Sequence, residues 1–413
     1  MKRAFVEKLK NVLIAVLIAT AVLLALETGV FHEIADGFRT VATIGEPVAG
    51  DDYAAPTEAA RPAAIAVRLD TGVRAVAKFD TAAVDSLYER TVSIMGEALS
   101  TAATPRPTTE AEWRAALTSS NIMYEYFAEA PLALVGRWLG ADIAGELPVL
   151  RVCLVLGDDS ALFFSGGDAF YRSATASLGG TVTVTTDYHD ERVYQFEFDA
   201  QSAAPYHILF NDSRHPTALV TNPLERSGAL STILAGFGID DAQRPGYTES
   251  DGTQVYVTGS FTLSVSPVGV LNYRRNAVAE SGGDIAPMVS DVEQARTLAQ
   301  RVLGAGSGDA RLWFSGVSTT VDGQGSVVRT VTFDYYLAGG RVFLQEAENA
   351  ATVTVADGVV TEMTLHFYSF ATEGEVLLLP EKQAIAAANG EMLLGYSDAA
   401  TSVPFWYATE GDD

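Results

Sequence analysis

A basic and then apolar N-terminal segment constrains this chain more than any other feature of its sequence. The apolar run extends from Val12 to Leu26, has Thr20 as its one polar residue, and follows four basic residues: Lys2, Arg3, Lys8 and Lys10. Extended to Phe31, the segment reaches about twenty residues, enough to cross a bilayer core of about 30 Å. Basic residues on the N-terminal flank favour a cytoplasmic N-terminus. We therefore predict a single transmembrane helix over residues 11–31 in the cell membrane, with an extracellular ectodomain after it.

A cleaved signal peptide is the alternative, because the fully apolar stretch is only about fifteen residues long. Ala25-Leu-Glu27 does not offer small residues at the alternating positions that cleavage needs, so we expect a retained anchor. Small residues also recur at four-residue spacing, which allows helices to approach closely in lipid. The simpler explanation is that alanine is common in any membrane span. The predicted partner-contact residues are Ala15, Ala19, Ala21, Val22 and Ala25.

The charge and cysteine content restrict the possible partners and cross-links. The 413 residues include 27 basic and 52 acidic side chains, a net charge of −25. Such a surface repels nucleic acid, so we expect no nucleic-acid partner. The single cysteine, Cys153, lies in an apolar strand-like run, which indicates a small buried side chain and excludes an intramolecular disulfide.

The patterns after the anchor predict an α+β ectodomain of antiparallel sheets packed with helices. Strands at 64–69 and 73–79 flank a turn at Asp70-Thr-Gly72, and Asp80 begins a helix. Thr109 and Glu112 form a capping box that opens a second helix, and Asn222-Pro223-Leu-Glu225 predicts a helix that carries Leu230, Ile233 and Leu234. Ser290 and Glu293 form another capping box, before a helix with a clear apolar face.

We divide the chain into six parts, of which the last two are α+β modules. Glycine turns recur in both modules with similar strands around them, at 252–273 and 340–359, which is consistent with a duplication. The predicted parts are a cytoplasmic tip (1–10), the span (11–31), a juxtamembrane linker (32–62), an N-terminal ectodomain region (63–205), a middle module (206–283) and a C-terminal module (284–413).

No sequence motif indicates catalysis, so we predict that the protein is not an enzyme and has no cofactor, catalytic residue or metal site. The histidines lack paired metal-ligand spacing: His32, His189, His207, His215 and His366. We expect His366 to occupy a surface or hydrogen-bonded position in a strand. We expect the polar cluster 188–192 to form a solvated loop. Three acidic turns, at 158–159, 250–252 and 322–325, lack the ligand pattern of a calcium loop and indicate hairpin turns.

Aromatic residues gather late in the chain and could line a groove for a peptide or a sugar. Packing inside a curled sheet would produce the same pattern. The cluster comprises Trp313, Phe333, Tyr335, Tyr336, Phe367, Tyr368, Tyr396, Phe405, Trp406 and Tyr407.

The whole layout resembles the YycH/YycI group of Gram-positive membrane proteins. The resemblance rests on the basic tip, the single span, the linker and the repeated α+β modules. Three stretches carry it: 121–131, the strand–strand–turn pattern of 252–273, and 380–396 with Leu393-Leu-Gly-Tyr396. Length and three ectodomain regions are more similar to YycH, and the C-terminal module alone is more similar to YycI.

This resemblance implies an accessory protein that modulates a two-component sensor histidine kinase of cell-wall homeostasis, through its span and its ectodomain. It also implies a YycI-like sister protein as a possible partner, and it brings no catalytic residue. Two other functions remain open from the residues: an extracytoplasmic ligand-binding or inhibitor module, and an unrecognised cell-wall hydrolase.

Overall fold

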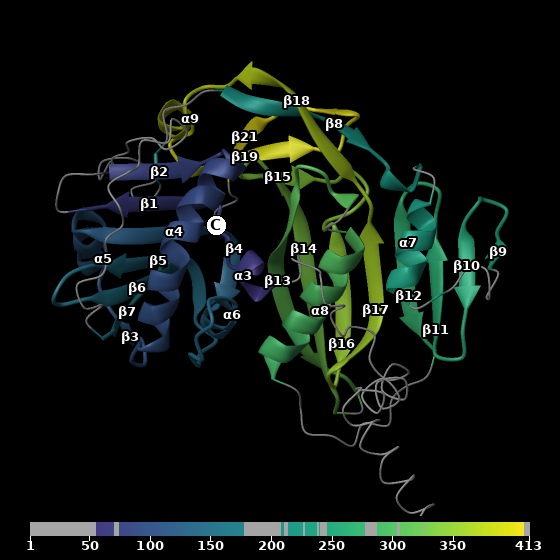
Figure 1. Cartoon of the computed structure of the whole chain (residues 1–413), viewed down its shortest axis with the longest axis horizontal. Coiled ribbons are helices and arrows are strands. Elements are labelled where there is room, and N and C mark those ends of the chain that lie inside the picture. The colour runs from purple at the N-terminus through teal and green to yellow at the C-terminus, as the bar shows by residue number, and fades with distance from the viewer. Residues whose placement is uncertain are drawn as a thin grey trace, which may run out of the picture. The chain divides into compact units, whose positions relative to one another are not determined.

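The computed structural model describes most of the predicted ectodomain as a mixture of helices and antiparallel sheets. The described residues are 55–69, 74–176, 208–209, 214–225, 228–237, 239, 246–276, 287–303, 306–323 and 325–408. Their helices are α3 (Pro56–Ala59), α4 (Thr81–Ser100), α5 (Glu110–Thr118), α6 (Leu132–Trp138), α7 (Ala229–Gly236), α8 (Met288–Leu303), α9 (Glu381–Ala388) and the short 3₁₀ turn η2 (Pro223–Glu225) (Figure 1). The α+β class with antiparallel sheets is confirmed.

The first sheet contains seven antiparallel strands in the order β2-β1-β4-β5-β6-β7-β3. Their bounds are β1 (Ala64–Arg68), β2 (Arg74–Lys78), β3 (Arg106–Pro107), β4 (Asn121–Pro131), β5 (Pro148–Val155), β6 (Ala161–Gly166) and β7 (Ala169–Ala174). The pairing of β1 with β2, from Ala64 opposite Lys78 to Arg68 opposite Arg74, confirms the first predicted pair of strands. The turn predicted between them, at 70–72, lies outside the described residues.

Helices cover both faces of this sheet. Successive side chains of a strand point to opposite faces, and β4 shows this at Met123 and Tyr124. Met123 belongs to a buried cluster with Trp113 and Leu117 of α5. The Tyr124 hydroxyl lies 2.7 Å from the Thr91 hydroxyl of α4. Because α4 and α5 therefore lie on opposite faces, almost every residue in the middle of β4, β5 and β6 is buried.

Side-chain caps begin both helices as predicted. The Ala83 amide donates to Asp80 Oδ1 at 3.0 Å, and the Glu112 amide donates to Thr109 Oγ1 at 3.2 Å. Each cap satisfies a donor that has no partner within its helix. Both N-terminal helix boundaries are thus confirmed.

The second sheet contains eleven strands in the order β21-β19-β15-β14-β16-β17-β12-β11-β10-β9, with β13 paired to β14 off this path. Their bounds are β9 (Tyr247–Thr248), β10 (Gln254–Val257), β11 (Phe261–Val265), β12 (Val270–Arg275), β13 (Arg311–Val321), β14 (Val327–Leu337), β15 (Gly340–Phe343), β16 (Ala351–Ala356), β17 (Val359–His366), β19 (Met392–Ser397) and β21 (Phe405–Ala408). Burial alternates along β11 and β16, and at β16 the buried face is the one that packs against α8 (Figure 1).

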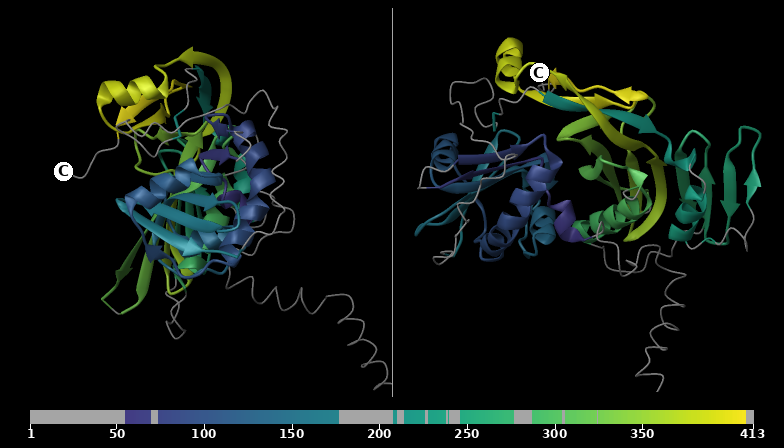
Figure 2. Two further views of the ribbon diagram at one scale, coloured as in Figure 1. Left: turned by 90° about the vertical axis from the view of Figure 1, so that its left-hand side faces the viewer. Right: turned by 45° about the horizontal axis from the view of Figure 1, so that its top comes forward.

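A third, small sheet connects distant parts of the chain. It has the order β18-β8-β20, and its strands are β8 (Arg214–Thr221), β18 (Ser369–Leu377) and β20 (Thr401–Ser402). The sequence analysis did not predict β8 or β18, whose polar and apolar residues follow no clear alternation. In Figure 2 the yellow C-terminal helix α9 lies beside the yellow strands that follow it, in agreement with the contact between α9 and β19.

Two predicted helix starts are wrong. Pro223–Glu225 forms the 3₁₀ turn η2, and the helix with Leu230, Ile233 and Leu234 begins separately at Ala229 after Gly228, whose φ is 84°. The Asn222 side chain instead caps the short turn by accepting from the Leu224 amide at 2.9 Å. The second error is Ser290, which lies inside α8 because that helix begins at Met288.

The domain boundaries and the duplication stay predictions. The middle and C-terminal modules contribute strands to one continuous sheet, since β12 of the middle module pairs with β17 of the C-terminal module. Among the described residues, no helix is both long and apolar enough to cross a bilayer. The predicted span, residues 11–31, lies outside them.

Candidate functional site

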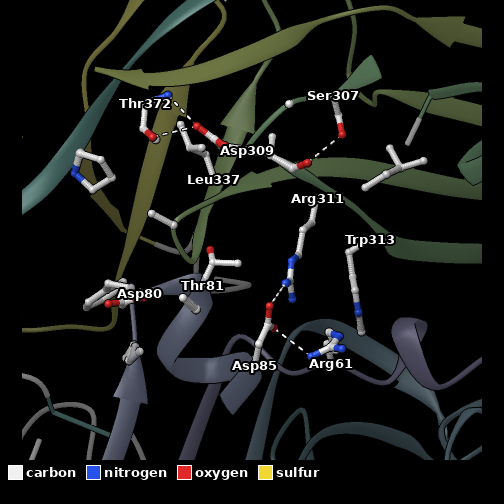
Figure 3. Close-up of a pocket in the computed structure, with 18 of the residues that line it drawn as sticks. Arg61, Asp80, Thr81, Asp85, Ser307, Asp309, Arg311, Trp313, Leu337 and Thr372 are labelled. Carbon is white, nitrogen blue, oxygen red and sulfur yellow. Dashed lines mark hydrogen bonds and ion pairs between the residues drawn. The ribbon is translucent and has the colours of Figure 1, made fainter. Parts of the chain in front are cut away.

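A charged cavity between the first sheet, the second sheet and the small sheet is the candidate functional site. Its volume is about 820 Å³, within the range of about 300–1,000 Å³ typical of small-molecule sites. Figure 3 shows its walls, formed by the first turns of α4, the start of β13 and part of β18. The charged lining residues are four cations, Arg61, Lys78, Arg214 and Arg311, and five anions, Glu58, Asp80, Asp85, Asp309 and Glu375.

The wall at α4 is formed by a sharp change of direction after β2. Phe79 adopts a positive φ of 63°, a conformation that costs energy for a residue with a side chain. Gly339 lies against Phe79, and a Cβ atom there would lie 3.1 Å from the Phe79 ring. This close approach holds the turn between β14 and β15 against the start of α4, so that Asp85 faces β13.

Asp85 connects two arginines across the cavity. Its carboxylate lies 3.0 Å from Arg61 Nη1 and also accepts a hydrogen bond from Arg311 Nη2 (Figure 3). Arg61 also forms a pair with Glu58, with Nε 2.6 Å from the carboxylate. Burial lowers the pKa of Arg61, but its hydrogen bond to Glu58 and the charge of Asp85 outweigh burial and raise this pKa above the usual value. The Arg61 side chain therefore stays cationic.

Arg311 has hydrogen-bond donors that its ion pair with Asp85 does not use. A guanidinium carries five N–H donors, and among the described residues Arg311 bonds only to Asp85. Its side chain is 30% exposed, against 13% for Arg61. Arg311 is therefore better placed than Arg61 to meet a negatively charged group inside the cavity, whereas Lys78 is buried against Glu381 and Arg214 is 69% exposed.

The opposite wall presents a carboxylate from the loop before β13. Asp309 Oδ2 accepts from the Thr372 amide at 2.8 Å and from the Thr372 hydroxyl at 2.7 Å (Figure 3). The loop is close to β18 because Gly308, with φ of 69°, leaves no room for a side chain: a Cβ atom there would lie 2.2 Å from the Phe370 carbonyl oxygen. The Asp309 side chain is thus held in place on one oxygen.

A buried ion pair closes the cavity near β2. Lys78 Nζ donates to Glu381 of α9 at 2.7 Å and to the Ile208 carbonyl at 3.2 Å. The side chains are 8% and 1% exposed. The pair connects the first sheet to the C-terminal helix. Removing one partner of such a pair strongly destabilises the folded protein, because the other charge stays buried without compensation.

Aromatic packing fills the junction beside the cavity. The Trp313 ring of β13 stacks on Tyr126 of β4 with the ring centres 5.8 Å apart, and Trp313 Nε1 donates to the Ala59 carbonyl at 2.9 Å. Most of the late aromatic cluster is buried: Trp313, Phe333, Tyr335, Tyr336, Phe367 and Tyr396. This burial supports core packing as the explanation of that cluster. Only Trp313 of the cluster also lines the cavity.

The other residues singled out in the sequence do not line this cavity, although His215 packs behind its wall against the lining residue Phe79. Cys153 is buried in β5, and burial raises its thiol pKa. His366 is half-buried at the end of β17, and burial lowers its pKa. His215 is buried between the rings of Phe79 and Trp406. Among the described residues, no group of three or more His, Cys, Asp or Glu could hold a metal ion.

The three acidic turns connect neighbouring strands, as predicted. They lie between β5 and β6, β9 and β10, and β13 and β14. The remaining sites lie outside the described residues: His32, His189, His207, the polar cluster 188–192, and the contact residues Ala15, Ala19, Ala21, Val22 and Ala25.

The sequence singled out two residues of the cavity, the helix cap Asp80 and Trp313 of the aromatic cluster, and missed Arg61, Asp85, Asp309 and Arg311. These residues come from separate elements and have no common spacing along the chain. A signal for them exists only in the folded chain.

The chain has a fold similar to that of YycH. No family model matches it, and no curated protein sequence matches it. The crystal structure of YycH from Bacillus subtilis aligns with a TM-score of 0.50 and 11% identity, over 85% of this chain and 93% of that chain. An uncharacterized protein from Eubacterium rectale aligns with a TM-score of 0.30 and 10% identity, over 49% of this chain and 81% of that chain.

Proposed function

We propose that this chain is a membrane-anchored extracytoplasmic accessory protein that modulates a two-component sensor histidine kinase of cell-wall homeostasis. The observation that carries this proposal is the YycH-like fold over 85% of the chain, in combination with the basic and apolar N-terminal segment. The sequence resemblance to the YycH/YycI group supplies the kinase and a YycI-like sister protein as partners.

In this proposal the span provides the contact with the kinase. Ala15, Ala19 and Val22 share one face of a helix with 3.6 residues per turn, and Ala21 and Ala25 lie together on a second face. Small side chains allow a second helix to approach closely in lipid. A coupling of about 1–3 kcal/mol between two kinase states would change the output by about 5–150-fold.

The test adds bulk to the contact face. The double variant Ala15→Leu/Ala19→Leu should block close helix approach and change kinase-dependent transcription at least about fivefold. Thr20→Leu adds a large side chain on another face and serves as the matched control, with regulation unchanged. An unrelated span in place of residues 11–31 should abolish the effect of the protein on the kinase.

Two results would contradict the proposal. One is normal regulation by the protein with the unrelated span. The other is mature protein that begins downstream of Leu26, since this would show that the anchor is removed.

A further inference from the structure

We propose that the charged cavity binds a short zwitterionic peptide, with its carboxylate at Arg311 and its ammonium at Asp309. This binding site goes beyond the proposed kinase role and does not depend on it.

The cavity has the size and position of a ligand site. Its volume of about 820 Å³ lies within the range for small-molecule sites, which occur preferentially where separate structural layers meet. The inner end is lined by buried residues of the second sheet, Leu312 and Leu337. The outer end carries Arg214 and Glu375, whose side chains are 69% and 63% exposed. A ligand can therefore enter from solvent and reach an enclosed interior.

The lining is close to charge-neutral in a strongly acidic protein. Four cations face five anions in the cavity, whereas the whole chain has a net charge of −25. Neither a polyanion nor a polycation would find matching charge there. A ligand with one charge of each sign would.

The carboxylate of such a ligand has a suitable partner in Arg311. This arginine bonds to Asp85 through one nitrogen, so the rest of the guanidinium can accept a carboxylate in two-point geometry. Thr81 and Ala82 of the first turn of α4 line the same space. The Ala83 amide of this turn is already capped by Asp80, but the amides of Thr81 and Ala82 have no acceptor within the helix and favour negative charge.

The ammonium has a suitable partner in Asp309. One of its oxygens is held by Thr372 at 2.8 and 2.7 Å, which fixes the carboxylate and leaves the other oxygen for a cation. Gln300 lines the space as well, with its Nε2 donating to the Leu312 carbonyl at 3.2 Å. The oxygen of the same side chain can accept from an amide of a peptide backbone.

The experiment measures binding of trialanine to the full-length chain in detergent by calorimetry, with no kinase present. Trialanine should bind saturably. N-acetyl-trialanine and trialanine amide, which lack one charge each, should bind at least about tenfold more weakly. Arg311→Gln should reduce trialanine affinity at least about tenfold, and Arg311→Lys, which keeps the charge, should reduce it less.

Asp309→Asn should remove the preference for trialanine over the acetylated form while the preference over the amide remains. Arg274→Gln is the matched control: Arg274 is an exposed arginine of β12, 3.5 Å from Glu362, and its removal should leave binding unchanged. Circular dichroism of each variant separates lost binding from lost folding.

The proposal is overturned by absence of saturable binding up to about 1 mM, by equal affinity for blocked and free trialanine, or by full affinity in a folded Arg311→Gln variant. Because no kinase takes part, these results leave the proposed kinase role standing. Failure of the span variants likewise leaves the peptide site standing.

Discussion

The two large sheets of this protein differ in how many of their faces are covered. In β6 of the first sheet, the neighbours Phe163 and Phe164 point to opposite faces, yet they are only 7% and 0% exposed. In β17 of the second sheet, Leu365 is 0% exposed whereas its neighbour Thr364 lies on the partly exposed face. Helices cover both faces of the first sheet and one face of the second.

This difference is visible in the residue pattern of each strand. A strand buried on both faces needs apolar residues at consecutive positions, as in Val152-Cys-Leu154 of β5. A strand buried on one face alternates, as in Phe261-Thr-Leu-Ser-Val265 of β11. The pattern therefore predicts the number of layers around a sheet, and three variant sets test this.

The largest effect is expected in the first sheet. Phe163→Ala and Phe164→Ala should each lower the free energy of unfolding by about 3–5 kcal/mol, because each removes a large buried side chain, on opposite faces. Chemical denaturation measures both values. A cost below about 1 kcal/mol for either variant would contradict burial on both faces.

A one-sided effect is expected in the second sheet. Leu365→Ala should lower the free energy of unfolding by about 2–5 kcal/mol, because its side chain is fully buried. Thr364→Ala, at the next position, should change it by no more than about 0.5 kcal/mol, since its hydrogen bond to Asn272 is exposed. The same denaturation experiment compares the two, and similar costs would show that a further layer covers the open face.

The smallest effect concerns pH at the end of β17. Burial lowers the pKa of His366 below its ordinary value of 6.5, so the unfolded chain binds a proton at a higher pH than the folded chain does. The contribution of His366 to stability is intact above about pH 6.5 and is lost as the pH falls from there towards the folded-state pKa.

His366→Gln should therefore reduce the loss of stability between neutral and mildly acidic pH. Melting temperatures of the parent and the variant across this range provide the measurement. Parallel curves would show that His366 is equally solvated in the folded and unfolded chains.

Local signals allowed much of the fold to be predicted. The pair of strands β1 and β2, the caps Asp80 and Thr109, and the strands around the glycine turns at 252–273 and 340–359 depend on neighbouring residues, which a sequence displays directly. The separation of η2 from α7 depends on Gly228 in a left-handed conformation, and Gly228 lies outside the four-residue capping motif at 222–225. Strands β8 and β18 pair across more than 140 positions of the sequence, from Thr221 opposite Ser369 to Arg214 opposite Leu377. In neither strand do polar and apolar residues alternate clearly.

The residues that line the cavity could not be predicted from the sequence, for a physical reason. Arg311 and Asp85 are separated by 226 positions, and Asp309 and Thr372 by 63. No local spacing connects such residues, and none of them alone belongs to a motif. Only the approach of the first sheet to β13 and β18 places them around one space.

The buried pair between Lys78 and Glu381 has a consequence for the order of events at the ribosome. The two residues are 303 positions apart, which corresponds to about 15–60 s of synthesis at about 5–20 residues per second. Throughout that time the first sheet holds a lysine whose partner does not yet exist. The newly made N-terminal half should therefore stay incompletely stabilised until α9 has been synthesised. Loss of the last few dozen residues by early termination should lower the stability of the first sheet, at the start of the ectodomain.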